Sequence, residues 1–387
     1  MKRGTFLAGG MAAASLLPAR PALAVFGDDR ITATITLGVV VPLTGPQLRE
    51  GEHITDGVRA ALDQANHLSG PLDRAFAMRT FNDENLLAEA LQNAQFAIDD
   101  PSVIAVIGHL GGQITSHVVP SYANARMPLI VPASTYDRIT LQGARNVFRL
   151  PTRDSTEGAL FAHYLAGNVK PKNVVALVQD GDYGPDVAGG FARQAANEKR
   201  TVNTVVFAVD KPDYRAAAKS ALSFSPDFIF LAGELKDMGP VVPALRSAGF
   251  TGAFGASEGF FNDATLKNYG EAVGAMLVSS SMPPLQRAPG VYRQVTDFQA
   301  RYGEMSAFSA FGYAAAQIVM SAVRRGGATD RSSLLRALNN GGSYDTIVGS
   351  FTFQPSGDPV DPNVYFYTVR DGKFHFERAA HPTSLIL

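Results

Sequence analysis

The chain has 387 residues, of which 46% are hydrophobic and 18% charged, with 34 basic residues against 35 acidic ones and no cysteine. A charge this close to balance argues against nucleic acid or an anionic membrane surface as a partner, and the lack of cysteine excludes disulfides and thiol chemistry. At about 150 residues per domain, the length predicts two domains with a sizeable core.

Residues 1–24 have the features of a cleavable secretory signal peptide. The basic pair Lys2-Arg3 precedes an apolar run, Thr5 to Leu17, that is too short to span a bilayer. Ala22-Leu23-Ala24 then supplies the small residues of a cleavage site. Cleavage after Ala24 would leave a slightly acidic mature chain, which we expect to be a free periplasmic protein.

The first part of the mature chain alternates between runs with strand and helix patterns. We expect strands at Ile35–Leu43, Phe76–Phe81, Val103–Ile107 and Leu129–Val131, and helices at Ile54–Asn66, Ala88–Ile98 and Ile114–Ala125. Alternation of this kind predicts βαβ units that build a parallel sheet.

A second α/β series begins after Pro151. Its expected strands are Val174–Val178, Val202–Val209, Phe228–Leu231, Ala253–Ala256 and Ala275–Ser279, and its expected helices are Glu157–Leu165, Pro185–Ala196, Tyr214–Leu222 and Met238–Ala248. The chain therefore predicts two sheets, one on each side of about residue 152.

The last third has helices without a sheet of their own. The expected helices are Val291–Tyr302, Phe311–Arg325 and Ser332–Asn339, followed by strands at Ile347–Phe353, Val364–Val369 and Lys373–Glu377. We expect the late helices to pack on the first sheet. This predicts an N-terminal lobe of residues 30–152 plus 284–360, a C-terminal lobe of residues 153–283 plus 361–387, and a ligand cleft between them.

Two neighbouring segments of the first series end in the same way. Val106–Gln113 and Leu129–Thr135 are both apolar runs that finish in small residues. In a parallel sheet, ligands bind beyond the carboxyl ends of the strands, and free backbone N–H groups there suit an anion. The pattern therefore predicts a carboxylate-binding site.

Catalytic, metal and cofactor motifs are weak by comparison. Gly255–Gly259 matches G-x-S-x-G, with Ser257 as the nucleophile, but only His375 and His381 follow it as candidate bases. The histidines lack metal-ligand spacing, Asp180–Gly184 lacks the later ligands of a calcium loop, and no P-loop or G-x-G-x-x-G is present. We expect no catalytic residue, metal or cofactor, with a serine hydrolase as a remote alternative.

The chain resembles the periplasmic amino-acid-binding proteins of ABC import systems, of the branched-chain (Leu/Ile/Val) type. The resemblance covers nearly the whole mature chain and is carried by Pro42–Pro46, Val106–Leu110, Val131–Thr135, Asp182–Gly184, Met238-Gly239, Ser257–Gly259 and Tyr313–Ala315. It implies a type I fold, in which two Rossmann-like α/β lobes are joined by a hinge of several strands. It also implies a monomer that delivers a small amino acid to a membrane permease.

The resemblance assigns roles to residues on both lobes. Thr135 matches the threonine that holds the ligand carboxylate, Ala133 a carbonyl that accepts from the ligand ammonium, and Glu258 the acid that pairs with this ammonium. Gly112 stands where the family usually has a serine that also holds the ligand carboxylate, so here only the backbone N–H can donate to that carboxylate. The other expected contacts are Leu110, Ser134, the pocket-wall Tyr183 and the apolar Phe308.

Two acids depart from the branched-chain pattern. Glu50 and Glu234 fall where these binding proteins typically carry aromatic residues, and an unpaired carboxylate does not suit an aliphatic side chain. Either the two acids face solvent, with Leu48 or Leu235 lining the pocket, or they face the ligand. The second possibility keeps another ligand open on the same fold: an amide, urea or an aromatic acid.

Overall fold

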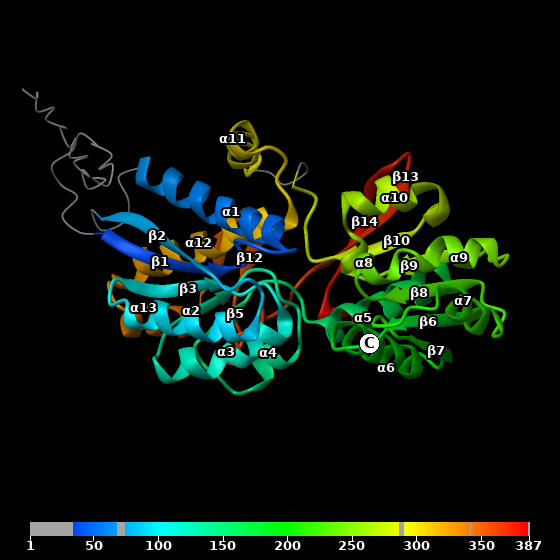
Figure 1. Cartoon of the computed structure of the whole chain (residues 1–387). Helices are drawn as coiled ribbons and strands as arrows, with labels where there is room; N and C mark the ends of the chain where they lie inside the picture. The colour runs from blue at the N-terminus through cyan, green and yellow to red at the C-terminus, as the bar shows by residue number, and fades with distance from the viewer. Residues whose placement is uncertain (1–33, 68–73, 286–289, 341, 386–387) are drawn as a thin grey trace, which may run out of the picture.

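A computed structural model describes residues 34–67, 74–285, 290–340 and 342–385. The predicted signal peptide, residues 1–24, lies outside the described residues. The described chain forms two α/β lobes that lie side by side (Figure 1).

The first lobe is built on a sheet of five parallel strands in the order β2-β1-β3-β4-β5. The strands are β1 Thr34–Val41, β2 Ala75–Asn82, β3 Val103–Gly108, β4 Leu129–Val131 and β5 Val147–Arg149. All six residues of β3 are buried, as expected for a central strand that is covered on both faces.

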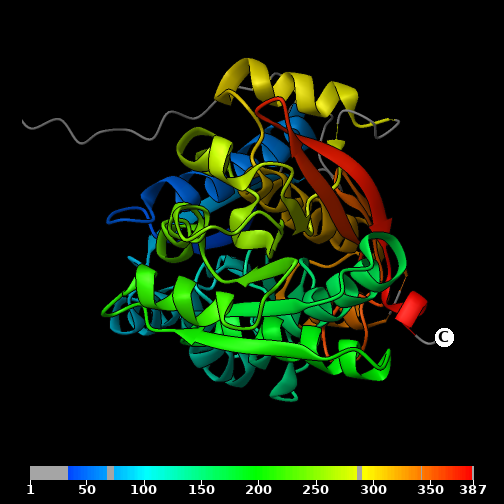
Figure 2. The same cartoon turned by 90° about the vertical axis from the view of Figure 1, so that its right-hand side faces the viewer.

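The second lobe has a seven-stranded sheet in the order β14-β13-β10-β9-β8-β6-β7. Its strands are β6 Val174–Gln179, β7 Val202–Phe207, β8 Phe228–Ala232, β9 Ala253–Ala256, β10 Leu277–Ser280, β13 Val364–Arg370 and β14 Lys373–Ala380. The last two strands run antiparallel at one edge and project from the lobe as a long hairpin (Figure 2).

Helices cover both faces of each sheet. The first lobe has α1 Leu48–His67, α2 Leu87–Asp99, α3 Gly112–Asn124, α4 Arg138–Leu141, α11 Tyr292–Tyr302, α12 Ala307–Gly326 and α13 Arg331–Asn339. Strand residues alternate between the two cores: Val39 and Val41 pack with α1 and α12, whereas Val40 packs with α2 and α3. This period of two is the property of a strand.

The second lobe repeats this arrangement. It has α5 Asp154–Tyr164, a π-helical turn Leu165–Val169, α6 Tyr183–Asn197, α7 Tyr214–Leu222, α8 Leu235–Met238, α9 Val241–Ser247 and α10 Asp263–Val273, with 3-10 turns at Glu258–Phe260 and Pro382–Leu385. Val175 and Leu177 of β6 face α7 and α9, whereas Ala176 and Val178 face α5 and α6.

The late helices α11, α12 and α13 belong to the core of the first lobe. Buried residues of all three share one cluster with β1 and α1, together with the short hairpin β11 Tyr344–Thr346 and β12 Gly349–Phe351. The chain therefore passes between the lobes three times, after β5, after β10 and before β13 (Figure 1).

The three crossing segments are hydrogen-bonded to one another. The Thr152 amide donates to the Ser281 hydroxyl at 3.2 Å, and the Thr152 hydroxyl donates to the Asn363 carbonyl at 3.3 Å. Away from this hinge the lobes also meet directly, because the Gln113 side chain on α3 donates to the Asp182 carboxylate just before α6.

Two predicted elements are wrong in detail. The helix expected at Met238–Ala248 begins only at Val241, as α9, and a separate short helix, α8, ends at Met238. The two are not continuous, because Pro240 between them lacks the N–H that a continuous helix needs. The strand expected at Ile347–Phe353 is instead a hairpin whose turn holds Ile347 and Val348. Both are buried in the core of the first lobe, so their apolar character reflects packing rather than strand pairing.

Within the described residues, no single helix is long and apolar enough to cross a membrane. The pair α11 and α12 passes such a test by length and composition only when the two are joined, and they are bent by 120°.

Candidate functional site

The ends of β3 and β4 lie side by side, as the doubled sequence pattern indicates. Val106 pairs with Leu129 and Ile107 with Ile130, so the loops that follow both strands leave the same edge of the sheet. Gly112 is the first residue of α3, where backbone N–H groups have no acceptor within the helix. These groups can serve an anionic ligand.

The packing around Gly112 explains why no serine stands there. A Cβ at this position would lie 2.7 Å from the Tyr136 Cβ and 3.2 Å from the Ser134 hydroxyl oxygen. A side chain would therefore collide with the loop that follows β4. The close approach of the two loops therefore fits the glycine at this position.

A buried arginine fixes the loop that carries Thr135. Arg149 on β5 donates from its Nη1 to the carbonyl oxygens of Thr135 at 2.9 Å and Tyr136 at 2.6 Å. Its other nitrogens donate to the Asp358 carboxylate at 3.0 and 2.5 Å. Arg149 is fully buried, so this ion pair holds the loop without competition from water.

Glu258 follows β9 and is held by residues at the end of β10. Its Oε1 accepts from the Ser281 amide at 3.0 Å and the Ser280 hydroxyl at 3.1 Å, and its Oε2 accepts from the Ser281 hydroxyl at 3.0 Å. Burial raises the pKa of Glu258, and these serine donors oppose that shift. The carboxyl is thus oriented, and a nearby cation would favour its charged form.

A second acid, Glu157 on α5, lies directly behind Glu258. Its Oε1 accepts from the Glu258 amide at 2.7 Å and the Ser279 hydroxyl at 2.6 Å, while its Oε2 is buried without a partner. Burial, with the Glu258 charge as a second cause, raises the pKa of Glu157 to about 8. The pair therefore holds at least one proton at neutral pH.

Tyr183 joins this group from the start of α6. Its hydroxyl accepts from the Gly259 amide at 3.2 Å. Burial raises the pKa of Tyr183 well above its ordinary value, and the charges of Glu157, Asp154 and Glu234 raise it further. Tyr183 is therefore a neutral hydroxyl among acids, placed beside the loop that carries Glu258.

The two acids that depart from the branched-chain pattern lie near each other. Glu234, just before α8, is exposed. Desolvation by the surrounding protein still raises its pKa, as do the charges of Asp237, Glu258 and Glu50, while Lys236 lowers it. Glu50 lies in the first turn of α1 and has a buried Oε2 without a hydrogen-bond partner. Glu234 therefore lies close enough to both Glu258 and Glu50 for their charges to act on it.

The remaining predicted contacts belong to the first lobe. Leu110 is buried in the core that contains β1 and α12, and Ala133 and Phe308 are partly buried against the same core. Ser134 is buried beside Gly112. The Thr135 side chain lies within hydrogen-bonding reach of the Asp154 carboxyl.

Ser257 is not placed as a hydrolase nucleophile should be. The residue is fully buried, and its hydroxyl accepts from the Gly233 amide at 3.2 Å. A nucleophile elbow exposes its serine at the top of the sheet, whereas this serine fastens the end of β9 to the loop after β8.

Sequence reasoning missed four residues that shape this region: Arg149, Asp358, Asp154 and Glu157. For three of them a key partner is far away in the chain: Arg149 and Asp358 are 209 residues apart, and Glu157 and Ser279 are 122 apart. The one available signal was the position of Asp154 and Glu157 in the first turn of a helix, where acids are common anyway.

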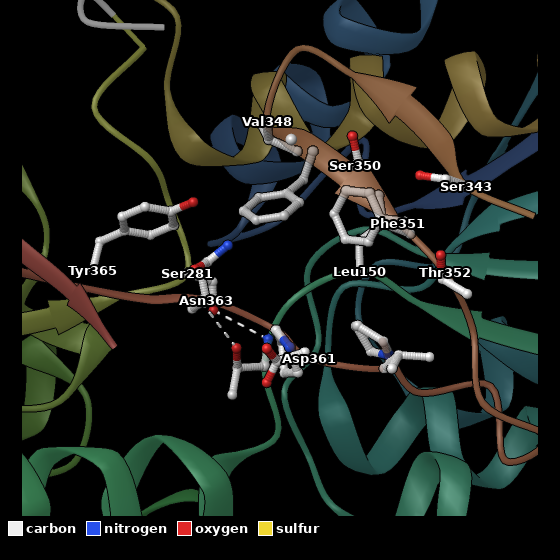
Figure 3. A pocket seen from close by; sticks show the side chains of 16 residues that line it. Leu150, Ser281, Ser343, Val348, Ser350, Phe351, Thr352, Asp361, Asn363 and Tyr365 are labelled. Carbon is white, nitrogen blue, oxygen red and sulfur yellow. Dashed lines mark hydrogen bonds between the residues drawn. The ribbon is translucent and has the colours of Figure 1, made fainter. Parts of the chain in front are cut away.

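A separate cavity of about 340 Å³ lies beside the hinge (Figure 3). The crossing segments and the short hairpin supply its lining, including Leu150, Ser281, Phe351, Asn363 and Tyr365. None of the ten predicted ligand contacts lines this cavity. The dashed lines in Figure 3 mark hydrogen bonds at Ser281 and Asn363, and the partner of both residues is Thr152.

Comparison with known proteins places this arrangement among binding proteins. A sequence profile described as periplasmic binding protein matches residues 34–373. Among curated relatives, Leu/Ile/Val-binding protein homolog 3 of Brucella melitensis is 24% identical over 345 residues, covering 88% of this chain and 93% of the relative.

Solved structures share the fold. The leucine-binding protein LivK of Thermotoga maritima has a TM-score of 0.81 at 25% identity, covering 90% of this chain and 99% of its own. A solute-binding protein of an ABC transporter from Rhodopseudomonas palustris, in complex with 3,4-dihydroxybenzoic acid, has a TM-score of 0.78 at 18% identity, covering 91% and 99%. The same architecture thus accompanies different ligands.

Proposed function

Because this chain belongs to the periplasmic binding protein family, we propose that it is a periplasmic receptor that binds a small amino acid between its two lobes. The observation that carries the proposal is the oriented carboxyl of Glu258, held by three donors from Ser280 and Ser281. A carboxylate fixed in this way suits a ligand ammonium.

The ligand carboxylate would lie at the first lobe. The free N–H groups at the start of α3, at Gly112, and the loop at Thr135 are its donors, with Ala133 contributing its carbonyl to the ammonium. Tyr183 and Phe308 would contact the rest of the ligand. Closure of the lobes would then exclude water, strengthen these charge-assisted bonds, and present a closed form to an ABC permease.

Binding to a panel of α-amino acids tests this proposal. Thermal shift measurements identify the ligand, and calorimetry gives its Kd. A hydrogen bond to a charged group contributes about 1.5–3 kcal/mol, so Glu258→Gln should weaken binding at least tenfold. Glu271→Gln, an exposed acid on α10, is the matched control and should leave Kd unchanged. If no α-amino acid stabilises the protein, the proposal is wrong.

A second candidate ligand is an amide or urea, and Glu50 and Glu234 favour it. Two further carboxylates beside Glu258 offer acceptors for N–H donors, and they disfavour a purely aliphatic side chain. They equally disfavour an aromatic acid, whose only charge is negative. Mass spectrometry of the ligand that co-purifies with the protein separates these candidates: an amide or urea supports the second, and an α-amino acid supports the first.

A further inference from the structure

Three aspartates from three separate segments converge between the lobes. Asp137 follows β4, Asp154 is the first residue of α5, and Asp186 lies on α6. One carboxylate oxygen from each lies within 4.8 Å of the other two. Their wide separation along the chain explains why the sequence shows no metal-ligand spacing here.

The negative charge of this cluster is not balanced by an ion pair. Among the described residues, no lysine, arginine or histidine lies within ion-pair distance of Asp137, Asp154 or Asp186. Burial raises the pKa of both Asp154 and Asp186, and the charges of Arg149 and Arg193 only oppose these shifts. Arg149 is also committed to Asp358.

The buried carboxyl of Asp154 is an independent observation that points to a ligand in the cluster. The residue is 1% exposed, and its Oδ1 has no hydrogen-bond partner. A buried polar atom without a partner costs about 1–3 kcal/mol, and more if it is charged. Asp137, by contrast, accepts from the amide and the hydroxyl of Ser155 at 3.1 and 2.5 Å, which fixes its orientation.

We propose that Asp137, Asp154 and Asp186 bind a calcium ion. Three carboxylates are hard oxygen ligands, which Ca²⁺ prefers. Two Ca–O bonds of 2.3–2.6 Å span about 5 Å, whereas two Mg–O bonds of 2.0–2.1 Å span only about 4 Å. The three oxygens lie within 4.8 Å of one another, which is inside the reach of two Ca–O bonds.

The site is open to solvent on one side. A surface hollow leads to it, lined by Tyr136, Asp137, Arg138, Leu141, Ser155, Pro185, Asp186 and Arg193, so water molecules can complete the coordination. Because Asp137 belongs to the loop after β4 and Asp186 to a helix packed on the second sheet, the bound ion would link the two lobes.

Terbium luminescence and calorimetry on the mature protein, first treated with EDTA, test this site. Tb³⁺ is a calcium analogue that Tyr136, in the same hollow, can sensitise. We expect saturable Tb³⁺ luminescence that Ca²⁺ displaces at least tenfold more effectively than Mg²⁺. Asp186→Asn, a nearly isosteric change at a partly exposed residue, should weaken Ca²⁺ binding at least tenfold.

The matched control is Asp210→Asn, at an exposed acid in the loop after β7, which should bind Ca²⁺ as the parent does. Circular dichroism of each variant in EDTA checks that it is folded. Two results would overturn the site: no saturable Ca²⁺ binding at millimolar concentration, or binding that Asp186→Asn leaves unchanged. Neither result depends on which organic ligand the cleft takes.

Discussion

Arg149 is the largest fully buried side chain among the described residues, and its charge is matched by Asp358. Removing one member of such a pair leaves the other charge buried without a partner, which costs about 3–5 kcal/mol. We therefore expect Arg149→Met to lower the free energy of unfolding by about that amount in urea titrations. The double substitution Arg149→Met with Asp358→Leu should lower the free energy of unfolding by less, because it leaves neither charge buried without a partner.

Arg293→Met is the control for this prediction, because the Arg293 side chain is 88% exposed and should tolerate the change. A loss in Arg149→Met no larger than in this control would show that the buried pair does not hold the Thr135 loop.

Glu157 should make the ligand-free protein less stable as the pH rises. Its pKa is raised from 4.5 to about 8 in the folded state, so the folded protein keeps a proton that the unfolded chain releases. This stabilisation is complete below pH 4.5 and is lost as the pH rises through about 8. Within that range the free energy of unfolding should fall by up to ~1.4 kcal/mol per pH unit. Urea titrations at pH 5 and pH 8 measure the loss.

Glu157→Gln removes the titration but keeps an oxygen that can accept from Ser279 and from the Glu258 amide. The variant should therefore show a smaller difference between the two pH values than the parent. An equal difference would mean that another group titrates.

At the scale of elements, the helix pair α1 and α12 depends on two glycines. A Cβ on Gly57 would lie 2.0 Å from the Ser309 carbonyl oxygen, and one on Gly312 would lie 2.4 Å from that of Ile54. These are backbone atoms that cannot rotate away. Gly57→Ala should therefore force the helices apart and lower the free energy of unfolding by about 1–3 kcal/mol.

The control lies on another helix. Gly270 on α10 has nothing within 4 Å of its would-be Cβ, so Gly270→Ala should be neutral or stabilising by about 0.5–1 kcal/mol. If both variants melt at the parent temperature, close packing is not the reason for a glycine at position 57.

The sequence predicted most elements because their periodicity follows from burial. Strands buried on both faces, such as β3, appear as short apolar runs, and α12 has an apolar face. The fold class, two α/β lobes of the type I periplasmic-binding-protein fold, is confirmed by structural similarity. The two predictions that were wrong in detail concern segments whose structure is set by a single residue, as at Pro240, or by the packing of a turn, as at Ile347.

The candidate site was only partly predictable. The strand ends before Gly112 and Thr135 are local patterns, and structure places them together. The roles assigned to Glu258 and Tyr183 came from the family resemblance and remain predictions. Arg149 and Glu157 could not be identified from the sequence. Their partners, Asp358 and Ser279, lie more than a hundred residues further along the chain.

At the scale of the whole molecule, Ser281 connects the hinge to the candidate ligand site. Its amide and hydroxyl donate to Glu258, and its hydroxyl accepts from the Thr152 amide on another crossing segment. We expect Ser281→Ala to weaken binding of the amino acid found in the panel by about tenfold, since it removes one hydrogen bond to a charged group.

Calorimetry gives the affinity of the Ser281→Ala variant, and small-angle scattering with and without ligand reports whether the lobes still close. Ser220→Ala, an exposed serine on α7, is the control. Equal affinities of the two variants would mean that the hinge serine does not support Glu258.

The threefold crossing also fixes the order in which the lobes can be completed during synthesis. A growing chain that ends before Ala307 contains all five strands of the first sheet but lacks α12, which covers it. The second sheet likewise waits for β13 and β14, the last two strands of the chain. Neither lobe can finish folding on the ribosome before nearly the whole polypeptide has been made, so each lobe keeps at least one open sheet face until late in synthesis.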